Sequence, residues 1–572
     1  MTSLVHELLS HSAQRSPNAI ALHIKETQLN YFQLNEAIIQ VAKSYKKRGL
    51  LQGERVGIYL AKNQENVQSM FACSLLGTVF VPINPVLKAP QVHYIANDCQ
   101  IKVLITNRTR LMTLKPFLND FTELKTVIVI DATPTELADI STETPLNMIN
   151  WASFISKDNR AEKDIVKGKI IEDSLTVKTA VAPNDLAAIL YTSGSTGQPK
   201  GIMLSHTNIV LGAKSVSQYL QLTPEDKILA VLPLSFDYGL NQLTSCFLIG
   251  AKCVLLDYLL ANDVIKAITH YEITGLAAVP PLWMQLTKTT WPINTGHSMR
   301  YFTNSGGVLP LKTLTTLQQN MPNAKPYLMY GLTEAFRSTF LSPDEIYNRP
   351  NSMGKAIPHS EILVLREDGS NCDDDEIGEL VHVGPLVTLG YWQNTRATTE
   401  RFKNTPKQAK NEKNIPLAVF SGDFVKRDSA GFIYFVSRKD MMIKTSGYRV
   451  SPTELESVLL QLNIINEAVI IGSPSVALGQ AIIAFIVISH DVQVVLSQSM
   501  NTPDINTESD QELPFIHNKK IKKEIIKHCQ FNLPNYMIPK EIIILNTLPR
   551  NANGKIDTAL LLLNYNQENG LS

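Results

Sequence analysis

The chain has 572 residues, 44% of them apolar, enough for several hydrophobic cores and therefore for more than one domain. Its formal net charge of +1 and its scattered lysines and arginines argue against a general nucleic-acid-binding protein. The six cysteines form no CxxC pair, and no apolar run reaches the roughly 18 residues of a transmembrane helix. We therefore expect a cytoplasmic protein without a transmembrane segment.

The first half of the chain alternates helix-like and strand-like segments. Residues 3–14 predict an amphipathic helix, residues 19–60 predict short strands around a helix over 32–48, and a helix is expected at about 64–76. Apolar runs that follow predict buried strands, which makes this region α/β. Residues 131–180 are polar and weakly periodic, and we interpret them as a variable surface excursion.

A loop rich in glycine, serine and threonine occupies residues 191–206, YTSGSTGQPKGIMLSH. Glycines allow close backbone approach, hydroxyls donate hydrogen bonds and Lys200 adds a positive charge, a combination that suits phosphate. The apolar run before it predicts a strand and Ser205 predicts a helix start, so we expect the loop to join strand to helix. It differs from the P-loop of nucleotide kinases because Lys200 follows Pro199 and no Ser or Thr follows the lysine.

Asp237 interrupts an apolar, aromatic segment, ILAVLPLSFDYGL. From its surroundings alone, this acid is either a helix cap or a charge in a pocket. Farther along, residues 273–283 predict a strand followed by a loop, and residues 302–310 contain a glycine turn. The sequence YGLTE follows at 330–334, with Arg337 three residues after Glu334.

The last third of the chain predicts smaller β-rich elements. Residues 361–395 predict strands with a hairpin at Asp368-Gly369, and 403–415 an exposed loop. Ser451 and Glu454 form a capping-box pattern at a helix start, and the polar segment 497–515 has no periodicity and is expected to be disordered. The basic stretch 517–527 predicts an amphipathic helix with a solvated face. The segment NGKID, which contains Lys555, predicts a turn.

Together with SGD at 421–423, SRKD at 437–440 and PRNANGKID at 549–557, these motifs resemble the adenylate-forming superfamily. That superfamily includes acyl-CoA ligases, adenylation domains of peptide synthetases and luciferases. The resemblance implies a large N-terminal domain of stacked α/β layers over residues 1–439, with a β-rich subdomain at about 360–439. A small mobile α+β domain would follow at 440–572.

The resemblance also assigns roles in ATP binding and adenylation. It implies that Tyr330 stacks on adenine, Asp423 accepts both ribose hydroxyls and Glu334 holds Mg²⁺, the only expected metal ligand. Lys200, Thr333, Glu334 and Lys555 would be catalytic, and we expect His206 to be structural. The residues assigned to ATP binding are Thr192, Ser193, Gly194, Ser195, Thr196, Gly197, Lys200, Gly306, Tyr330, Gly331, Thr333, Asp423, Arg438 and Lys555.

The acid pocket is assigned to Asp237, Tyr238, Asn304, Met329 and Arg337. The SFD segment resembles amino-acid-activating domains, in which the aspartate binds the substrate ammonium. With a guanidinium nearby, the pocket suggests an acidic amino acid recognised at both ends. Alternatively, Arg337 pairs with Asp237 or with a phosphate, and the substrate is an ordinary acyl acid.

For the second half-reaction, the resemblance places a hinge at Asp440 and a thiol channel at Lys444 and Gly447. Ser421 and Ser437 stand where the family usually has Thr and Gly, and we expect them to change hinge packing rather than ATP binding.

The predicted function is therefore an ATP-dependent acid–thiol ligase that forms an acyl-adenylate and transfers the acyl group to CoA. The alternative is transfer of an amino acid to the phosphopantetheine of a separate carrier protein, and a remoter one is a luciferase-like oxidoreductase. The expected ligands are ATP, Mg²⁺, a small carboxylic acid and one of these thiols, without nucleic acid.

Overall fold

The computed structural model describes residues 2–156, 180–192, 199–404, 417–438, 441–445, 448–475, 478–489, 512–533, 535–551 and 554–569. Contacts divide the chain into two compact units. Unit 1 comprises Met1–Leu363 and Val381–Ser421, and unit 2 comprises Val364–Leu380 and Gly422–Ser572. The boundary expected at residue 440 stays a prediction. None of the described helices is long and apolar enough to span a membrane.

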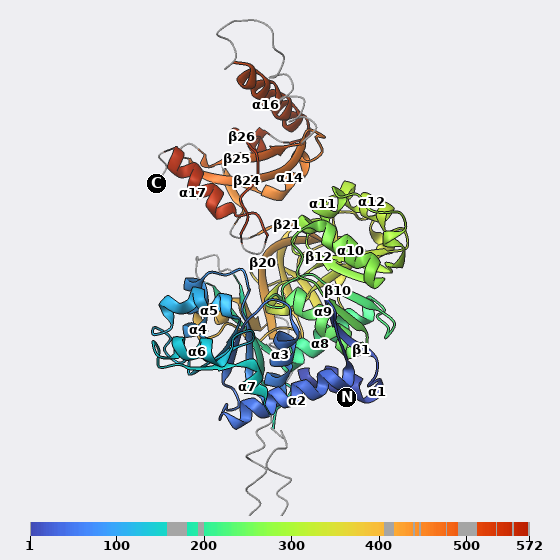
Figure 1. The fold of residues 1–572 in the computed structure, drawn as a ribbon. Coiled ribbons are helices and arrows are strands. Elements are labelled where there is room, and N and C mark those ends of the chain that lie inside the picture. Colours follow the sequence, from blue (N-terminus) through green and yellow to red (C-terminus); the bar gives the residue numbers. More distant parts are fainter. Residues whose placement is uncertain are drawn as a thin grey trace, which may run out of the picture. The chain divides into compact units, whose positions relative to one another are not determined.

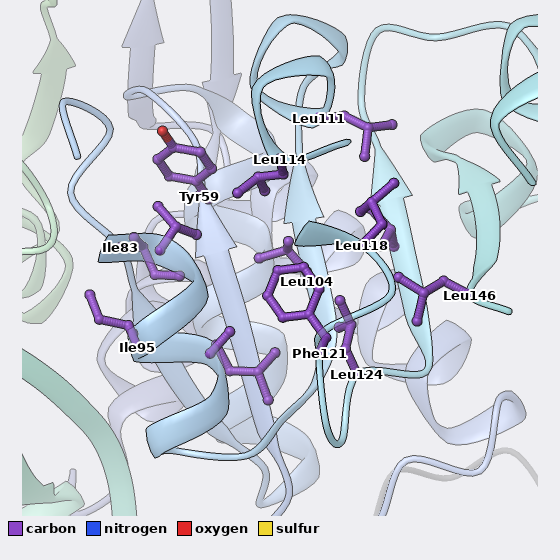
Figure 2. Packing of buried hydrophobic residues seen from close by; sticks show 14 of the residues in the cluster. Tyr59, Ile83, Ile95, Leu104, Leu111, Leu114, Leu118, Phe121, Leu124 and Leu146 are labelled. Carbon is purple, nitrogen blue, oxygen red and sulfur yellow. The ribbon is translucent and has the colours of Figure 1, made fainter. Parts of the chain in front are cut away.

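One sheet of unit 1 has seven strands, all parallel to their neighbours except the last pair. Its hydrophobic cluster, which includes Leu104 and Phe121, packs the strands against α4(Ala89–Asp98) and α5(Arg108–Leu114) (Figure 2). The strand order is β7(Asn147–Asn150), β6(Thr126–Val129), β5(Ile101–Thr106), β3(Arg55–Tyr59), β4(Val79–Pro82), β8(Leu186–Thr192) and β9(Lys200–Ser205).

Two expectations for this region are wrong. The phosphate-loop segment joins β8 to β9, an antiparallel strand, because Ile202 and Leu204 are buried in the sheet before the helix begins at His206. Residues 131–156 are not a surface excursion, since they form α6(Pro134–Ser141), β7 and α7(Trp151–Ile155) and bury Leu137, Leu146 and Phe154. The remainder of that excursion, 157–179, lies outside the described residues.

The second sheet of unit 1 contains four adjacent strands that run parallel, β10(Lys227–Ala230), β12(Gly275–Ala278), β13(Tyr301–Asn304) and β14(Lys325–Tyr330). Their carboxyl ends therefore meet at one edge, where ligands of open α/β sheets commonly bind. Beyond β14 come β15(Thr339–Leu341) and β16(Ser352–Ala356), and beyond β10 come β11(Lys252–Leu255), β1(Ile20–Ile24) and β2(Thr27–Asn30).

Helices fill the space between the two sheets. α8(His206–Tyr219) packs on β8 and β9, α9(Asp237–Ile249) packs on β10 and β11, and the two helices contact each other. α1(Val5–Arg15), α2(Tyr31–Lys47) and α3(Gln64–Leu76) complete this layer (Figure 1). The stacked α/β arrangement is confirmed. The other helices of unit 1 are α4(Ala89–Asp98), α5(Arg108–Leu114), α10(Ala261–Tyr271), α11(Pro280–Thr287), α12(Leu311–Asn320) and α13(Thr395–Arg401).

Unit 2 is built on a sheet with the order β23(Tyr448–Val450), β22(Ile443–Thr445), β25(Gly479–Ile488), β24(Ile465–Ser475), with β26(Glu541–Leu545) parallel to β25. α14(Pro452–Leu459) and α16(Glu512–Asn532) contribute apolar residues to one core and α17(Thr558–Glu568) to another. The amphipathic helix is confirmed, with Ile521 and Ile525 buried. Because α16 begins at Glu512, the expectation of disorder is wrong for the last four residues of 497–515.

The remaining strands are β17(Glu361–Leu365), β18(Gly378–Val383), β19(Phe402–Asn404), β20(Leu417–Arg427) and β21(Ile433–Arg438). The turn at Asp368-Gly369 is confirmed, because Gly369 has a φ of +81° and its N–H donates to the Arg366 carbonyl. The predicted loop at 403–415 lies largely outside the described residues. After β12 the chain enters α11 directly, so the loop expected after residue 278 is a helix that starts with Pro280.

Candidate active site

The parallel strands of unit 1 bring several predicted site residues to the same edge of the sheet. Asn304 is the last residue of β13 and Tyr330 the last of β14, and these two strands are neighbours. Asp237 starts α9, which follows β10 in the chain. These three segments are separated in the sequence, and the strand order of the sheet brings their ends to one edge.

Asp237 is a buried charge rather than a helix cap. Phe236 occupies the N-cap position of α9 and makes no side-chain cap hydrogen bond. The Asp237 carboxylate instead accepts a hydrogen bond from Arg337 Nη1 at 2.9 Å, and both side chains are nearly inaccessible to solvent, 5% and 3% exposed. The structure therefore contains a direct Arg337–Asp237 pair, one of the partners that the sequence suggested for Arg337.

The backbone before Arg337 adopts a strained turn. Thr333–Ala335 form a short 3-10 helix, after which Phe336 takes φ = +59° and ψ = −45°. The N–H of Arg337 donates to the Ala335 carbonyl at 2.6 Å, which closes a γ-turn of the rare positive-φ type. The Phe336 ring lies against Gly212 of α8, where an added Cβ would come within 2.2 Å of a ring carbon. Strain of this kind persists where the surrounding structure imposes it, most often at functional sites.

A second cluster joins three segments that are far apart in the sequence. Tyr391 donates a hydrogen bond through its hydroxyl to Glu334 Oε1 at 2.7 Å, and Lys200 Nζ lies 5.7 Å from the centre of the Tyr391 ring. The backbone supports this contact, because Thr388 N–H donates to the Glu334 carbonyl and Ile202 of β9 forms a bridge with Tyr391. Tyr391 thus contacts both Lys200 and Glu334, two of the predicted catalytic residues.

Tyr391 was missed by the sequence analysis. It stands in the segment GYW, and neither its neighbours Gly390 and Trp392 nor its spacing from other motifs indicates a polar role. Its contact with Glu334 depends on the pairing of its segment with β9, and that pairing carries no local sequence signal. The stretch around it was interpreted as β-rich structure alone.

Glu334 fits a role as a Mg²⁺ ligand. Mg²⁺ commonly binds one or two carboxylates and takes its remaining ligands from water and phosphate oxygens. Within the described part of the chain, no group of three or more His, Cys, Asp or Glu side chains could hold a metal by itself. A single half-buried carboxylate fixed by a tyrosine hydroxyl agrees with an ion shared with a bound phosphate.

The other residues assigned to the acid pocket are buried in unit 1. Tyr238 shares a hydrogen bond with Thr303, its ring lies 4.7 Å from the Arg337 guanidinium carbon, and burial raises its pKa well above the usual value. Met329 accepts a hydrogen bond from Tyr219 through its sulfur, and Asn304 donates to the Gly307 carbonyl. Gly306 has φ = +79°, the left-handed conformation that glycine adopts without strain.

Four predicted site residues lie in described parts of unit 2, namely Asp423, Arg438, Lys444 and Lys555. Asp423 and Arg438 are cross-strand partners in β20 and β21, and the Arg438 Nε lies 3.4 Å from the carboxylate of Asp423. Lys555 is exposed on a turn in which its N–H donates to the Asn551 side chain and its carbonyl accepts from the Asn551 N–H. Ser437 is buried beside Arg438 and Ser421 ends unit 1.

Several predicted positions lie outside the described residues: Ser193, Gly194, Ser195, Thr196, Gly197, Asp440 and Gly447. Lys444 lies in β22, and Thr192 and Lys200 end β8 and begin β9, on either side of the phosphate-loop segment.

His206 has the structural role expected for it. Its Nδ1 accepts a hydrogen bond from the Val5 N–H at 3.2 Å, and burial lowers its pKa to about 4. The imidazole is therefore neutral at neutral pH, and its hydrogen bond connects α1 to α8.

Comparison with known protein families is in agreement with this geometry. The sequence model described as "AMP-binding enzyme" matches residues 9–392, which is more than half of the chain. The chain belongs to the AMP-binding enzyme family. The model described as "AMP-binding enzyme C-terminal domain" matches residues 454–555.

Relatives of this AMP-binding enzyme include ligases named for CoA and a ligase named for a carrier protein. It is 25% identical to indoleacetate–CoA ligase of Aromatoleum aromaticum, with 96% of each chain covered. It is 26% identical to 2-succinylbenzoate–CoA ligase of Oceanobacillus iheyensis, with 97% of this chain and 98% of that protein covered. It is also 26% identical, with the same coverage, to L-proline–[L-prolyl-carrier protein] ligase of Pseudomonas fluorescens.

Solved structures share the fold. The anthranilate CoA ligase AuaEII, in complex with anthranoyl-AMP, has a TM-score of 0.77 at 23% identity, with 98% of this chain and 97% of that chain covered. The o-succinylbenzoate CoA synthetase of Bacillus subtilis, in complex with ATP and a magnesium ion, has a TM-score of 0.72 at 24% identity, with coverage of 96% and 98%.

Proposed function

We propose that this AMP-binding enzyme is an ATP-dependent acid–thiol ligase. The observation that carries the proposal is the cluster of Lys200, Tyr391 and Glu334, which combines a cation and a fixed carboxylate beside the segment that precedes β9. The names of full-length relatives support it, since they are ligases that join acids to CoA or to a carrier protein.

In the first half-reaction, an oxygen of the substrate carboxylate attacks the α-phosphorus of ATP. The bond from that phosphorus to the bridging oxygen of pyrophosphate breaks, and an acyl-adenylate forms. Negative charge accumulates on the phosphates, so fixed positive groups lower the barrier. In this proposal Lys200 and Lys555 supply such charges, and Thr333, which lies in the same 3-10 helix as Glu334, donates a hydrogen bond to the phosphate.

Mg²⁺ bound at Glu334 would neutralise phosphate charge, and Tyr391 would keep the carboxylate oriented toward it. Asp423 and Arg438 would bind the ribose and phosphate. In the second half-reaction, a thiol attacks the acyl carbon and AMP leaves. We propose CoA as the thiol. The carrier-protein ligase among the relatives makes a phosphopantetheine arm the second candidate.

The test is ATP–pyrophosphate exchange with a panel of fatty, aromatic, hydroxy and amino acids, followed by thioester formation with CoA or a phosphopantetheinylated carrier protein. We expect exchange that requires both Mg²⁺ and one class of acid. A purified, folded protein that binds ATP but shows no exchange with any acid would contradict the proposed function.

A further inference from the structure

The Arg337 guanidinium carries two hydrogen-bond donors that the described part of the protein leaves unmet. Its Nη1 donates to Asp237 at 2.9 Å and to the Phe336 carbonyl at 2.8 Å. Its Nε and Nη2 are buried and have no hydrogen-bond partner among the described residues. The side chain is only 3% exposed, so these two donors are shielded from bulk water.

Two other arginines of this chain use the same edge to bind a carboxylate. Arg300 places its Nε and Nη2 on the two oxygens of Asp226, at 3.1 and 2.7 Å. Arg366 binds Glu376 through the same pair of nitrogens. Both have more exposed side chains than Arg337. The most deeply buried of these three guanidinium groups is therefore the one whose carboxylate-binding edge lacks a partner.

Leaving this edge empty is unfavourable. A guanidinium stays protonated in a protein and cannot reduce its desolvation cost by losing a proton. Buried donors without acceptors lose their hydrogen bonds to water and gain nothing in exchange. The γ-turn at Phe336 and the packing of its ring on Gly212 hold Arg337 in place despite the unfavourable free energy of its unmet donors. Strain and unmet donors in one segment indicate a position kept for a ligand.

We propose that the acid activated by this enzyme carries a second carboxylate, which binds side-on to Nε and Nη2 of Arg337. The inference rests on the proposed function, because it names the substrate class of the same site. Two parallel N–H donors match the two oxygens of a carboxylate, and the bidentate pair fixes the orientation of the acid. The first carboxylate remains the one that reacts with ATP.

Charge balance selects among such acids. Asp237 already compensates Arg337, so a second carboxylate alone adds a net negative charge to a buried site. An acid that also places an ammonium near Asp237 gives an alternating row of four charges with no net charge. Acidic amino acids bring both groups, and simple dicarboxylic acids bring only one.

The experiment measures pyrophosphate exchange with short dicarboxylic acids, with their monomethyl esters and with acidic amino acids. We compare the wild type with Arg337→Lys, which keeps the charge but loses the fork. We also use the double variant Asp237→Asn/Arg337→Met, which leaves no lone buried charge. Asp226→Asn/Arg300→Met is the matched control, since it removes an arginine–aspartate pair whose edge is already filled.

We expect the wild type to prefer an acid with a free second carboxylate over its monomethyl ester by about tenfold or more in kcat/KM. This ratio should fall toward one in both Arg337 variants and stay unchanged in the control. Greater activity with acidic amino acids would support the proposal and place an ammonium near Asp237.

Two results would overturn the inference while the proposed function stands. One is robust exchange in which diacids and their monoesters react equally well. The other is a loss of equilibrium ATP binding in Arg337→Lys without any acid present, which would assign the open edge to a phosphate. Absence of exchange with every acid, in a protein that binds ATP, would instead remove the proposed function and this inference together.

Discussion

At the scale of single residues, the site depends on side chains whose role comes from their partners. Glu334 is a half-buried carboxylate, and what distinguishes it is the Tyr391 hydroxyl on Oε1. Lys200 Nζ lies 5.7 Å from the centre of the Tyr391 ring, so Tyr391 contacts both the expected metal ligand and the cation that we expect to bind phosphate. We interpret Tyr391 as a positioning residue, because it acts through these two neighbours.

The first prediction concerns Tyr391→Phe, which keeps the ring beside Lys200 and removes the hydrogen bond to Glu334. A hydrogen bond to a charged group contributes roughly 1.5–3 kcal/mol, so we expect about a tenfold rise in the Mg²⁺ concentration needed for half-maximal pyrophosphate exchange. Tyr565→Phe is the matched control, since Tyr565 donates to Glu541 at the same distance of 2.7 Å, outside the site. Equal Mg²⁺ dependence in wild type and Tyr391→Phe would contradict the positioning role.

At the scale of elements, a histidine joins three helices. His206 begins α8, and its Nδ1 accepts from the Val5 N–H of α1 and lies 3.4 Å from the Ser74 hydroxyl of α3. Burial lowers the pKa of His206 to about 4, an effect that His6 reinforces and that Asp185 and Glu7 oppose. Protonation of Nδ1 would remove the acceptor for Val5, so the contact requires the neutral ring.

A pH dependence follows from this contact. In the unfolded chain His206 titrates near its usual value of 6.5, so below that pH the unfolded state binds more protons than the folded state. The contribution of His206 to the free energy of unfolding is complete above pH 6.5 and is lost as the pH falls toward about 4. The total loss is about 3 kcal/mol. The measurement is the urea midpoint between pH 7 and 4.5.

His206→Gln is the comparison variant, since its amide oxygen still accepts a hydrogen bond but does not titrate in this range. The urea midpoint of the variant should depend less on pH than that of the wild type. Parallel pH curves would show that His206 does not control the acid sensitivity. His382, whose pKa burial lowers to about 3, is unchanged in both proteins and contributes equally.

Elements with strong local signals could be predicted from sequence. The helix at α3 and the cap at Ser451 follow from apolar spacing and capping chemistry, and the structure has both. The strand character of residues 200–205 and the edge strand β7 could not be predicted, because each depends on pairing with another strand, β8 for β9 and β6 for β7, and short residue patterns do not show such pairing. The Asp237–Arg337 pair was left open for the same reason, since sequence does not show which way a side chain points.

At the scale of the whole molecule, the proposed reaction divides between the two units. Unit 1 carries Lys200, Glu334 and Arg337, whereas Lys555, Asp423 and Arg438 belong to unit 2. An exposed lysine on a turn, such as Lys555, contributes little to the stability of the fold, because water solvates its charge. If Lys555 acts on the α-phosphate during adenylation and is replaced by the thiol site afterwards, the two half-reactions need it to different extents.

The last prediction is that Lys555→Ala separates the half-reactions. Loss of one charge that stabilises the transition state lowers such rates by about 100- to 1000-fold, so pyrophosphate exchange should fall by that factor. Thioester formation from a supplied acyl-adenylate should stay within a few-fold of wild type, because the acid is already activated. Lys540→Ala, which removes another exposed lysine of unit 2, is the control and should affect neither step. An equal loss in both half-reactions would mean that Lys555 supports the fold or a step common to both, because a charge needed only on the α-phosphate has no role once the adenylate exists.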